Sequence, residues 1–134
     1  MRAYVDSSAA AKLVINEPES DPMAQFANRD DVEMVSCVLL ETELRRVATR
    51  AGQSQSKVTK VLESIEVFSL EDGDFRAAGL MAGATLRSLD ALHLTAALFT
   101  KAEIVVTYDN RMTDAATTLL GMQVVQPRRL TDQD

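Results

Sequence analysis

The sequence is poor in cysteine, histidine and aromatic residues, and each shortage excludes a class of chemistry. Its 134 residues contain one cysteine, one histidine, no tryptophan and 4% aromatic residues. The single Cys37 cannot form an intramolecular disulfide, and its apolar neighbours favour a buried, unreactive thiol. The single His93 cannot supply a pair of histidines for acid–base catalysis. So few aromatic rings also make extensive base stacking an unsuitable mode of binding.

The chain also lacks a net positive charge and long apolar runs. With 14 basic and 20 acidic residues its formal net charge is −6, so no overall field attracts a polyanion. No apolar run approaches the roughly 20 residues of a transmembrane helix, and Asp6 interrupts the N-terminus before a signal peptide could form. We therefore expect a soluble, cytoplasmic protein.

Apolar sequence is nevertheless sufficient for one core. Apolar residues make up 46% of the chain, which excludes general disorder, and 134 residues is the size of one ordinary domain. The chain shows no repeat, no low-complexity segment and no linker. We expect a single domain over 1–134, with a loose tail over 128–134.

Strand-like runs alternate along the chain with helical patterns. Strands are expected over 2–5, 33–36, 66–69, 103–107 and 122–125. Helices are expected over 9–16, 21–28, 38–51, 55–64, 71–86, 89–99 and 111–120. Ser7 or Ser8 is expected to cap the first helix, and Ser88 the sixth. The alternation predicts an α/β fold with a mainly parallel sheet that helices cover on both faces.

Four acidic residues are placed where such a fold binds ligands. Asp6 and Asp109 each follow an apolar run of strand type, and Glu43 and Asp90 lie in early turns of helices. Carboxylates at the carboxyl ends of parallel strands point into the crevice used by open α/β sheets. Several of them together repel one another unless a hard cation such as Mg²⁺ or Mn²⁺ lies between them. The pattern predicts metal-assisted chemistry on a phosphate ester.

Each of these acids also has an ordinary structural explanation. Asp6 and Asp109 can simply cap the helices that follow them. Asp90 falls in the first turn of a helix, where the dipole stabilises a negative charge by about 0.3–1 kcal/mol. Only their joint placement favours a site.

Glu41 and Glu43 compete for the fourth position. Residues two positions apart on a helix are separated by about 200° around its axis, so Glu41 and Glu43 cannot both face one site. Glu41 has Arg45 four residues later, an ordinary solvated ion pair, which favours Glu43 for the site. Two further polar residues receive the plainer interpretation: His93 is taken as a packed structural histidine and Asp114 as an exposed helical acid rather than an outer ligand.

Four segments together resemble a known family. These are 4–9, 42–46, 89–94 and 107–112, with the sequences YVDSSA, TELRR, LDALHL and TYDNRM. They resemble PIN-domain ribonucleases and, more narrowly, the VapC toxins of bacterial and archaeal toxin–antitoxin pairs.

That resemblance implies both a fold and a function. The implied fold is an α/β/α sandwich, and the implied activity is an Mg²⁺- or Mn²⁺-dependent endoribonuclease. It also implies a cognate VapB-type antitoxin that blocks the site, and a homodimer. By motif match, Asp6, Glu43, Asp90 and Asp109 take the positions that hold the metal.

The basic residues leave two interpretations open. Five of them follow Glu43 on two successive helices, and three others stand beside Asp109 and near the C-terminus: Arg45, Arg46, Arg50, Lys57, Lys60, Arg111, Arg128 and Arg129. They form either ordinary solvated helix faces or a rim that holds RNA phosphates around the acidic site.

Two other functions remain as alternatives. One is a PIN-like binding module without activity, although clustered acids kept without a cation would destabilise the fold. The other is phosphoryl transfer through an aspartyl phosphate at Asp6. A phosphatase of the haloacid-dehalogenase type would have an acid two residues later, where this chain has Ser8, and the paired acids and late lysine of a receiver domain are absent.

Overall fold

The computed structural model describes residues 1–83 and 85–128, and its centre is a five-stranded parallel sheet. The strands are β1 (Arg2–Val5), β2 (Glu33–Cys37), β3 (Glu66–Phe68), β4 (Ile104–Val106) and β5 (Gln123–Val125). Their order is β3-β2-β1-β4-β5, and every neighbouring pair is parallel. All five predicted strands are therefore present, and no strand end differs from its prediction by more than one residue.

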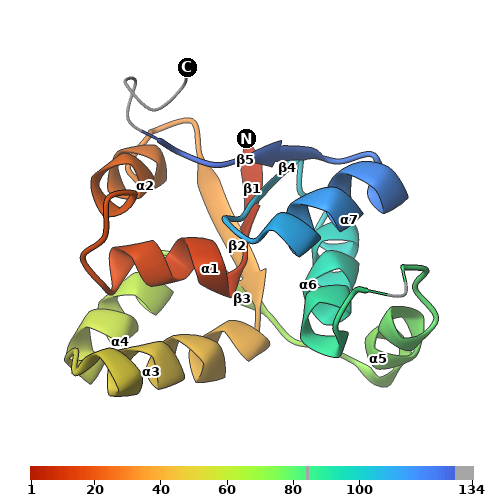
Figure 1. The fold of residues 1–134 in the computed structure, drawn as a ribbon, viewed down its shortest axis with the longest axis horizontal. Helices are drawn as coiled ribbons and strands as arrows, with labels where there is room; N and C mark the ends of the chain where they lie inside the picture. The colour runs from red at the N-terminus through yellow and green to blue at the C-terminus, as the bar shows by residue number, and fades with distance from the viewer. Residues whose placement is uncertain (84, 129–134) are drawn as a thin grey trace.

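Helices cover both faces of this sheet. They are α1 (Ser7–Ala10), the 3-10 turn η1 (Ala11–Leu13), α2 (Ser20–Ala27), α3 (Leu39–Ala51), α4 (Gln55–Glu63), α5 (Asp72–Gly79), α6 (Ser88–Phe99) and α7 (Asn110–Leu120). Figure 1 shows α1 to α4 on one side of the strands and α5 to α7 on the other. The predicted α/β/α sandwich is confirmed.

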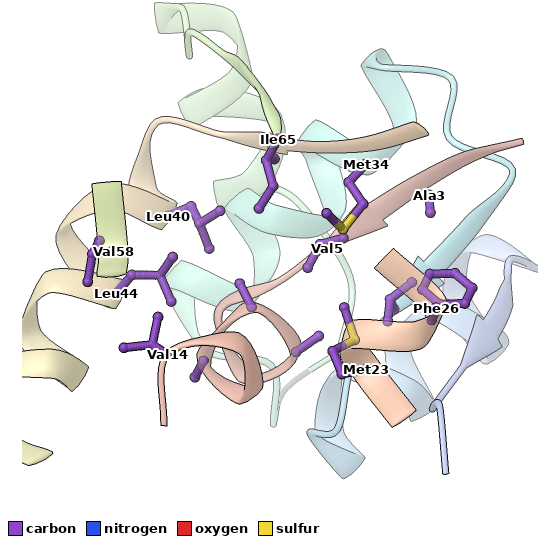
Figure 2. Packing of buried hydrophobic residues seen from close by; sticks show 14 of the residues in the cluster. Ala3, Val5, Val14, Met23, Phe26, Met34, Leu40, Leu44, Val58 and Ile65 are labelled. Carbon is purple, nitrogen blue, oxygen red and sulfur yellow. The ribbon is translucent and has the colours of Figure 1, made fainter. Parts of the chain in front are cut away.

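Alternation along the strands divides the buried side chains into two layers. On β1, Ala3 and Val5 pack with α1, α2, α3 and α4, while Tyr4 between them packs with α6 and α7. The first layer is drawn in Figure 2, where Leu40 and Leu44 of α3 lie close to Val58 of α4. The fully buried strands thus read as continuous apolar runs, as expected for a parallel sheet.

Most helix ends agree with the predictions to within one residue, but three helices differ in a cap or in a larger shift of an end. Asp6, not a serine, caps the first helix, because its carboxylate accepts the Ala9 N–H; α1 therefore begins at Ser7 and soon tightens into η1. Ser88 is the first residue of α6 and makes no cap, since Arg87 occupies the N-cap position without a side-chain bond. The helix predicted over 71–86 ends at Gly79, which is consistent with the low helix propensity of its glycines.

Two glycines end helices as predicted. Gly52 after α3 has φ 66° and Gly121 after α7 has φ 62°, the left-handed conformation that closes a helix and favours glycine. Most of the predicted tail, 129–134, lies outside the described residues. Within the described ranges, no helix is long and apolar enough to cross a membrane.

The strand order fixes where a ligand can bind. From β1 the chain proceeds outward through β2 and β3, and then returns to the other side of β1 as β4 and β5. The order therefore reverses between β1 and β4, and the crevice of such a sheet opens beyond the carboxyl ends of these two strands. Asp6 and Thr107 are the residues that follow them directly.

Candidate active site

Asp6 is a buried carboxylate at the reversal point of the sheet. Asp6 is 3% exposed. Oδ1 accepts hydrogen bonds from Ser8 Oγ at 2.7 Å and from Ala9 N at 3.0 Å, and Oδ2 accepts one from Thr107 Oγ1 at 2.5 Å. Burial raises the pKa of Asp6, and these hydrogen bonds offset that rise only in part. The carboxylate is thus held by three hydrogen bonds, and the charge of His93 also lowers its pKa without cancelling the effect of burial.

Thr107 connects Asp6 to the second aspartate of the site. Its hydroxyl donates to Asp6 and accepts a hydrogen bond from Asp109 N at 3.1 Å. Asp109 is the N-cap of α7, and its Oδ1 accepts from Arg111 N at 2.8 Å and Met112 N at 3.0 Å. No hydrogen bond among the described residues uses Asp109 Oδ2, which leaves that oxygen able to bind another group.

Glu43 of α3 reaches the same end of the sheet from one side. Its Oε2 accepts a hydrogen bond from Ser7 Oγ at 3.1 Å, and its Oε1 accepts one from His93 Nε2 at 2.6 Å. Glu41, by contrast, is exposed and pairs with Arg45 at 2.9 Å. The structure therefore places Glu43, and not Glu41, beside the segment that follows β1.

Asp90 lies half-buried in the first turn of α6. Burial raises its pKa, the negative charge of Asp109 raises it further, and the charges of Arg87 and His93 act in the opposite direction. The two aspartates, 19 positions apart in the sequence, therefore share one negative region at the start of α6 and α7.

His93 is packed, as predicted, but it also contacts the acidic residues. It is 2% exposed, and its Nδ1 lies 2.7 Å from Tyr4 Oη. Burial lowers its pKa, whereas the hydrogen bonds to Cys37 and Glu43 and the Glu43 charge raise it, with the net result at about 10. Because an ionised carboxylate only accepts hydrogen bonds, the N–H at Nε2 donates to Glu43, and Nδ1 faces the Tyr4 hydroxyl.

The acids are close in the fold, but they do not enclose a cation as the side chains stand. In residues 1–83 and 85–128, no group of three His, Cys, Asp or Glu side chains is arranged to hold a metal ion. Carboxylates without a cation repel one another, and the hydrogen bonds of Glu43 go to Ser7 and His93. The assignment of Asp6, Glu43, Asp90 and Asp109 as metal ligands stays a prediction.

The donor chemistry at this edge nevertheless fits a hard divalent cation. All four candidate donors are carboxylates, the ligands that Mg²⁺ and Mn²⁺ prefer. Asp6 is buried, and no salt bridge in the described part of the chain supplies it with positive charge. Its Oδ2 accepts one hydrogen bond and retains a second lone pair.

Three other charged residues considered in the sequence lie on α3 and α7. Asp114 is exposed on α7, in agreement with the plainer interpretation. Arg45 is occupied by Glu41 and by the Gln55 side chain. Arg111 is exposed directly after the Asp109 cap, so it is the basic residue of the predicted rim whose position next to the acids is clearest.

Comparison with known proteins agrees with this geometry. A sequence model of the PIN domain family matches residues 3–117. That is most of the chain, and it includes all four acids. The chain belongs to the PIN domain family.

Individual relatives of this PIN domain are named ribonucleases. This chain is 36% identical over 127 residues to the ribonuclease VapC46 of Mycobacterium tuberculosis, and the match covers 92% of this chain and 96% of the relative. Among solved structures it matches M. tuberculosis VapC20, a toxin that cleaves the sarcin–ricin loop, with TM-score 0.73, 12% identity and coverage of 93% and 99%. A toxin–antitoxin complex from Klebsiella pneumoniae matches with TM-score 0.68, 18% identity and coverage of 96% and 99%.

These matches place the PIN domain among the VapC ribonucleases and confirm the family predicted from the four segments. The two structural matches have low identity, so they establish the fold alone.

Sequence reasoning missed two residues of the site, Tyr4 and Thr107. Thr107 had a visible signal, because it is a hydroxyl residue directly after a strand and two positions before Asp109. Tyr4 had none, since its position inside an apolar run indicates only burial.

The raised pKa of Asp6 leads to a prediction about stability. Folding raises the pKa of the Asp6 carboxyl above its ordinary value of 3.8. Such a group contributes fully to the free energy of unfolding below pH 3.8, and this contribution is lost as the pH rises through the folded-state pKa. In EDTA at pH 7.5, Asp6→Asn should therefore melt about 3 °C or more above the wild type, which corresponds to about 1 kcal/mol. The difference should shrink toward pH 4, as measured by circular dichroism.

Asp114→Asn is the matched control, because it makes the same change at an exposed position. Its melting temperature should follow that of the wild type at every pH. An Asp6→Asn protein that is less stable than the wild type at pH 7.5 in EDTA would contradict the conclusion that the buried charge is costly.

Proposed function

We propose that this chain is a metal-dependent endoribonuclease that acts as the toxin of a VapBC-type toxin–antitoxin pair. The observation that carries the proposal is the buried Asp6 carboxylate at the reversal point of the sheet, joined through Thr107 to Asp109. The ribonuclease names of its relatives support RNA as the substrate. RNA also fits a site of this kind because every phosphate of its backbone offers oxygens to a hard cation.

Asp6, Glu43, Asp90 and Asp109 would together hold one or two Mg²⁺ or Mn²⁺ ions. When bound, such a metal lowers the pKa of a water that attacks phosphorus and neutralises charge on the leaving oxygen. The chain's own residues fix the ligands: Thr107 and the α1 backbone orient Asp6, and the α7 backbone orients Asp109. No side-chain nucleophile is required.

Basic residues at the same edge would position the RNA backbone. Arg111 is exposed next to Asp109, and Arg87 is exposed directly before α6. Arginine binds phosphate oxygens in a planar, bidentate geometry. Such contacts fix the register of the backbone without reading the bases, which suits a protein with few aromatic residues.

The two alternatives receive less support from the geometry. A phosphatase of the haloacid-dehalogenase type would have a second acid two residues after Asp6, and that position holds Ser8, whose hydroxyl donates to Asp6 Oδ1. A binding module without activity would not need Asp6 at a buried position, where burial raises its pKa in spite of three hydrogen bonds.

We further propose a VapB-type antitoxin as partner, a homodimer as the assembly and the cytoplasm as the compartment. A structural neighbour is a toxin–antitoxin complex, and an arginine of a partner could pair with the acids in place of the metal. Light scattering of the chain alone should give a dimer, and expression with its antitoxin should give a larger complex that does not cleave RNA. A monomer that forms no such complex would contradict the assembly proposed.

The activity can be tested with a pair of glutamates on one helix. Glu43→Gln removes a candidate ligand charge and should slow RNA cleavage by about 100-fold or more, equivalent to about 2.7 kcal/mol in the barrier. Glu41→Gln makes the same change at an exposed position two residues away and should cleave within about twofold of the wild type. Cleavage should stop in EDTA and return with Mg²⁺ or Mn²⁺.

Sequencing of the cut ends in the same assay would reveal which RNA is the substrate. Full cleavage by the wild type in excess EDTA would exclude the metal mechanism. Equal loss of activity in the two glutamine variants would exclude a specific role for Glu43.

A further inference from the structure

One buried histidine, His93, links the sheet to Glu43 of α3. His93 lies on α6 and is 2% exposed, and Tyr4 on β1 is 1% exposed. The two rings meet edge to face with centroids 5.8 Å apart. Tyr4 Oη and His93 Nδ1 share a hydrogen bond of 2.7 Å, and His93 Nε2 donates to Glu43 Oε1 at 2.6 Å. The imidazole is therefore held at both nitrogens, and its orientation is fixed.

Glu43 is held differently from the two aspartates that cap helices. Asp6 and Asp109 each accept at least one N–H from the helix that they begin, so the backbone itself places them. Glu43 lies within α3 and has a longer side chain with more rotatable bonds. Its two partners, Ser7 and His93, come from α1 and α6. Its carboxylate therefore depends on other elements for its position.

We propose that His93 is a positioning residue that holds the Glu43 carboxylate at the acidic edge, and that the Tyr4 hydroxyl fixes the orientation of the imidazole. This inference rests on the proposed function, because it gives Glu43 a role in binding the divalent metal. A ligand that is already held in place loses less conformational freedom when the metal binds. Removal of the support should therefore weaken metal binding without changing any ligand.

The competing explanation is that His93 only fills space in the second apolar layer. Two substitutions separate the explanations. His93→Leu keeps a side chain of similar volume and removes the N–H donor. His93→Gln supplies an amide N–H that can reach the position of Nε2. A space-filling role predicts that both variants bind metal as the wild type does once they are folded, whereas positioning predicts that only the glutamine variant does.

The measurement is a Mn²⁺ titration of the purified full chain, with free Mn²⁺ followed by electron paramagnetic resonance. His93→Leu should weaken Mn²⁺ binding by about 10- to 100-fold, and His93→Gln should remain within about threefold of the wild type. Leu94→Val is the control, because Leu94 is fully buried on the same helix without a polar contact to the site. It should lower the melting temperature and leave the Mn²⁺ affinity unchanged.

A double variant tests whether His93 acts through Glu43. If it does, His93→Leu should cause no further loss of Mn²⁺ affinity in a Glu43→Gln background. Should His93→Leu fail to fold by circular dichroism, Tyr4→Phe replaces it, since that change removes one hydroxyl and should weaken Mn²⁺ binding severalfold. Unchanged Mn²⁺ affinity in the folded variant used would overturn the inference.

The outcomes also separate this inference from the proposed function. A wild type that binds Mn²⁺ and cleaves RNA, beside a His93→Leu protein with the same Mn²⁺ affinity, would overturn the positioning role alone. A wild type that binds no Mn²⁺ would overturn both.

Discussion

The hydrogen bonds around the buried Asp6 carboxylate are the contacts on which the rest of the site depends. They come from both strands at the reversal point: Ser8 and Ala9 follow β1, and Thr107 follows β4. Residues about 100 positions apart in the sequence are joined in this way at one carboxylate. Because Thr107 also accepts the Asp109 N–H, the position of Asp6 and the start of α7 are coupled.

The parallel sheet accounts for this convergence. In a parallel arrangement all carboxyl ends of the strands meet at one edge, and each following helix begins there with free N–H groups. Asp6 and Asp109 use those N–H groups as helix caps, and Asp90 lies in the first turn of α6. Capping and metal binding therefore require the same residue type at the same place. A role in starting a helix is compatible with a role in metal binding for each of these acids.

Sequence patterns predicted the sheet and the family well, because both depend on local signals. Buried parallel strands appear as short β-branched runs, and Gly52 and Gly121 end their helices through a backbone conformation that favours glycine. Serine and aspartate suit the cap of α1 equally well, and local sequence does not rank them. The serine cap is wrong, and the alternative that Asp6 caps this helix is confirmed. Asp6 caps α1 through the Ala9 N–H, and its other oxygen accepts from Thr107, a contact that no local pattern contains.

The contacts of the single histidine could not be predicted for the same reason. Periodicity places His93 on a buried face of α6, and that part is confirmed. Its partners Tyr4, Cys37 and Glu43 come from β1, β2 and α3. Only the packing of α6 against the sheet brings them together. A buried polar residue must find partners, but the sequence does not say which ones.

The most direct test of the central claim, that these acids form one metal site, is anomalous scattering from crystals of the chain soaked in Mn²⁺. We predict a Mn²⁺ peak at the carboxyl ends of β1 and β4, bound by the carboxylates of Asp6, Glu43, Asp90 and Asp109. Absence of a peak at this edge, at a Mn²⁺ concentration that supports RNA cleavage in solution, would contradict that claim.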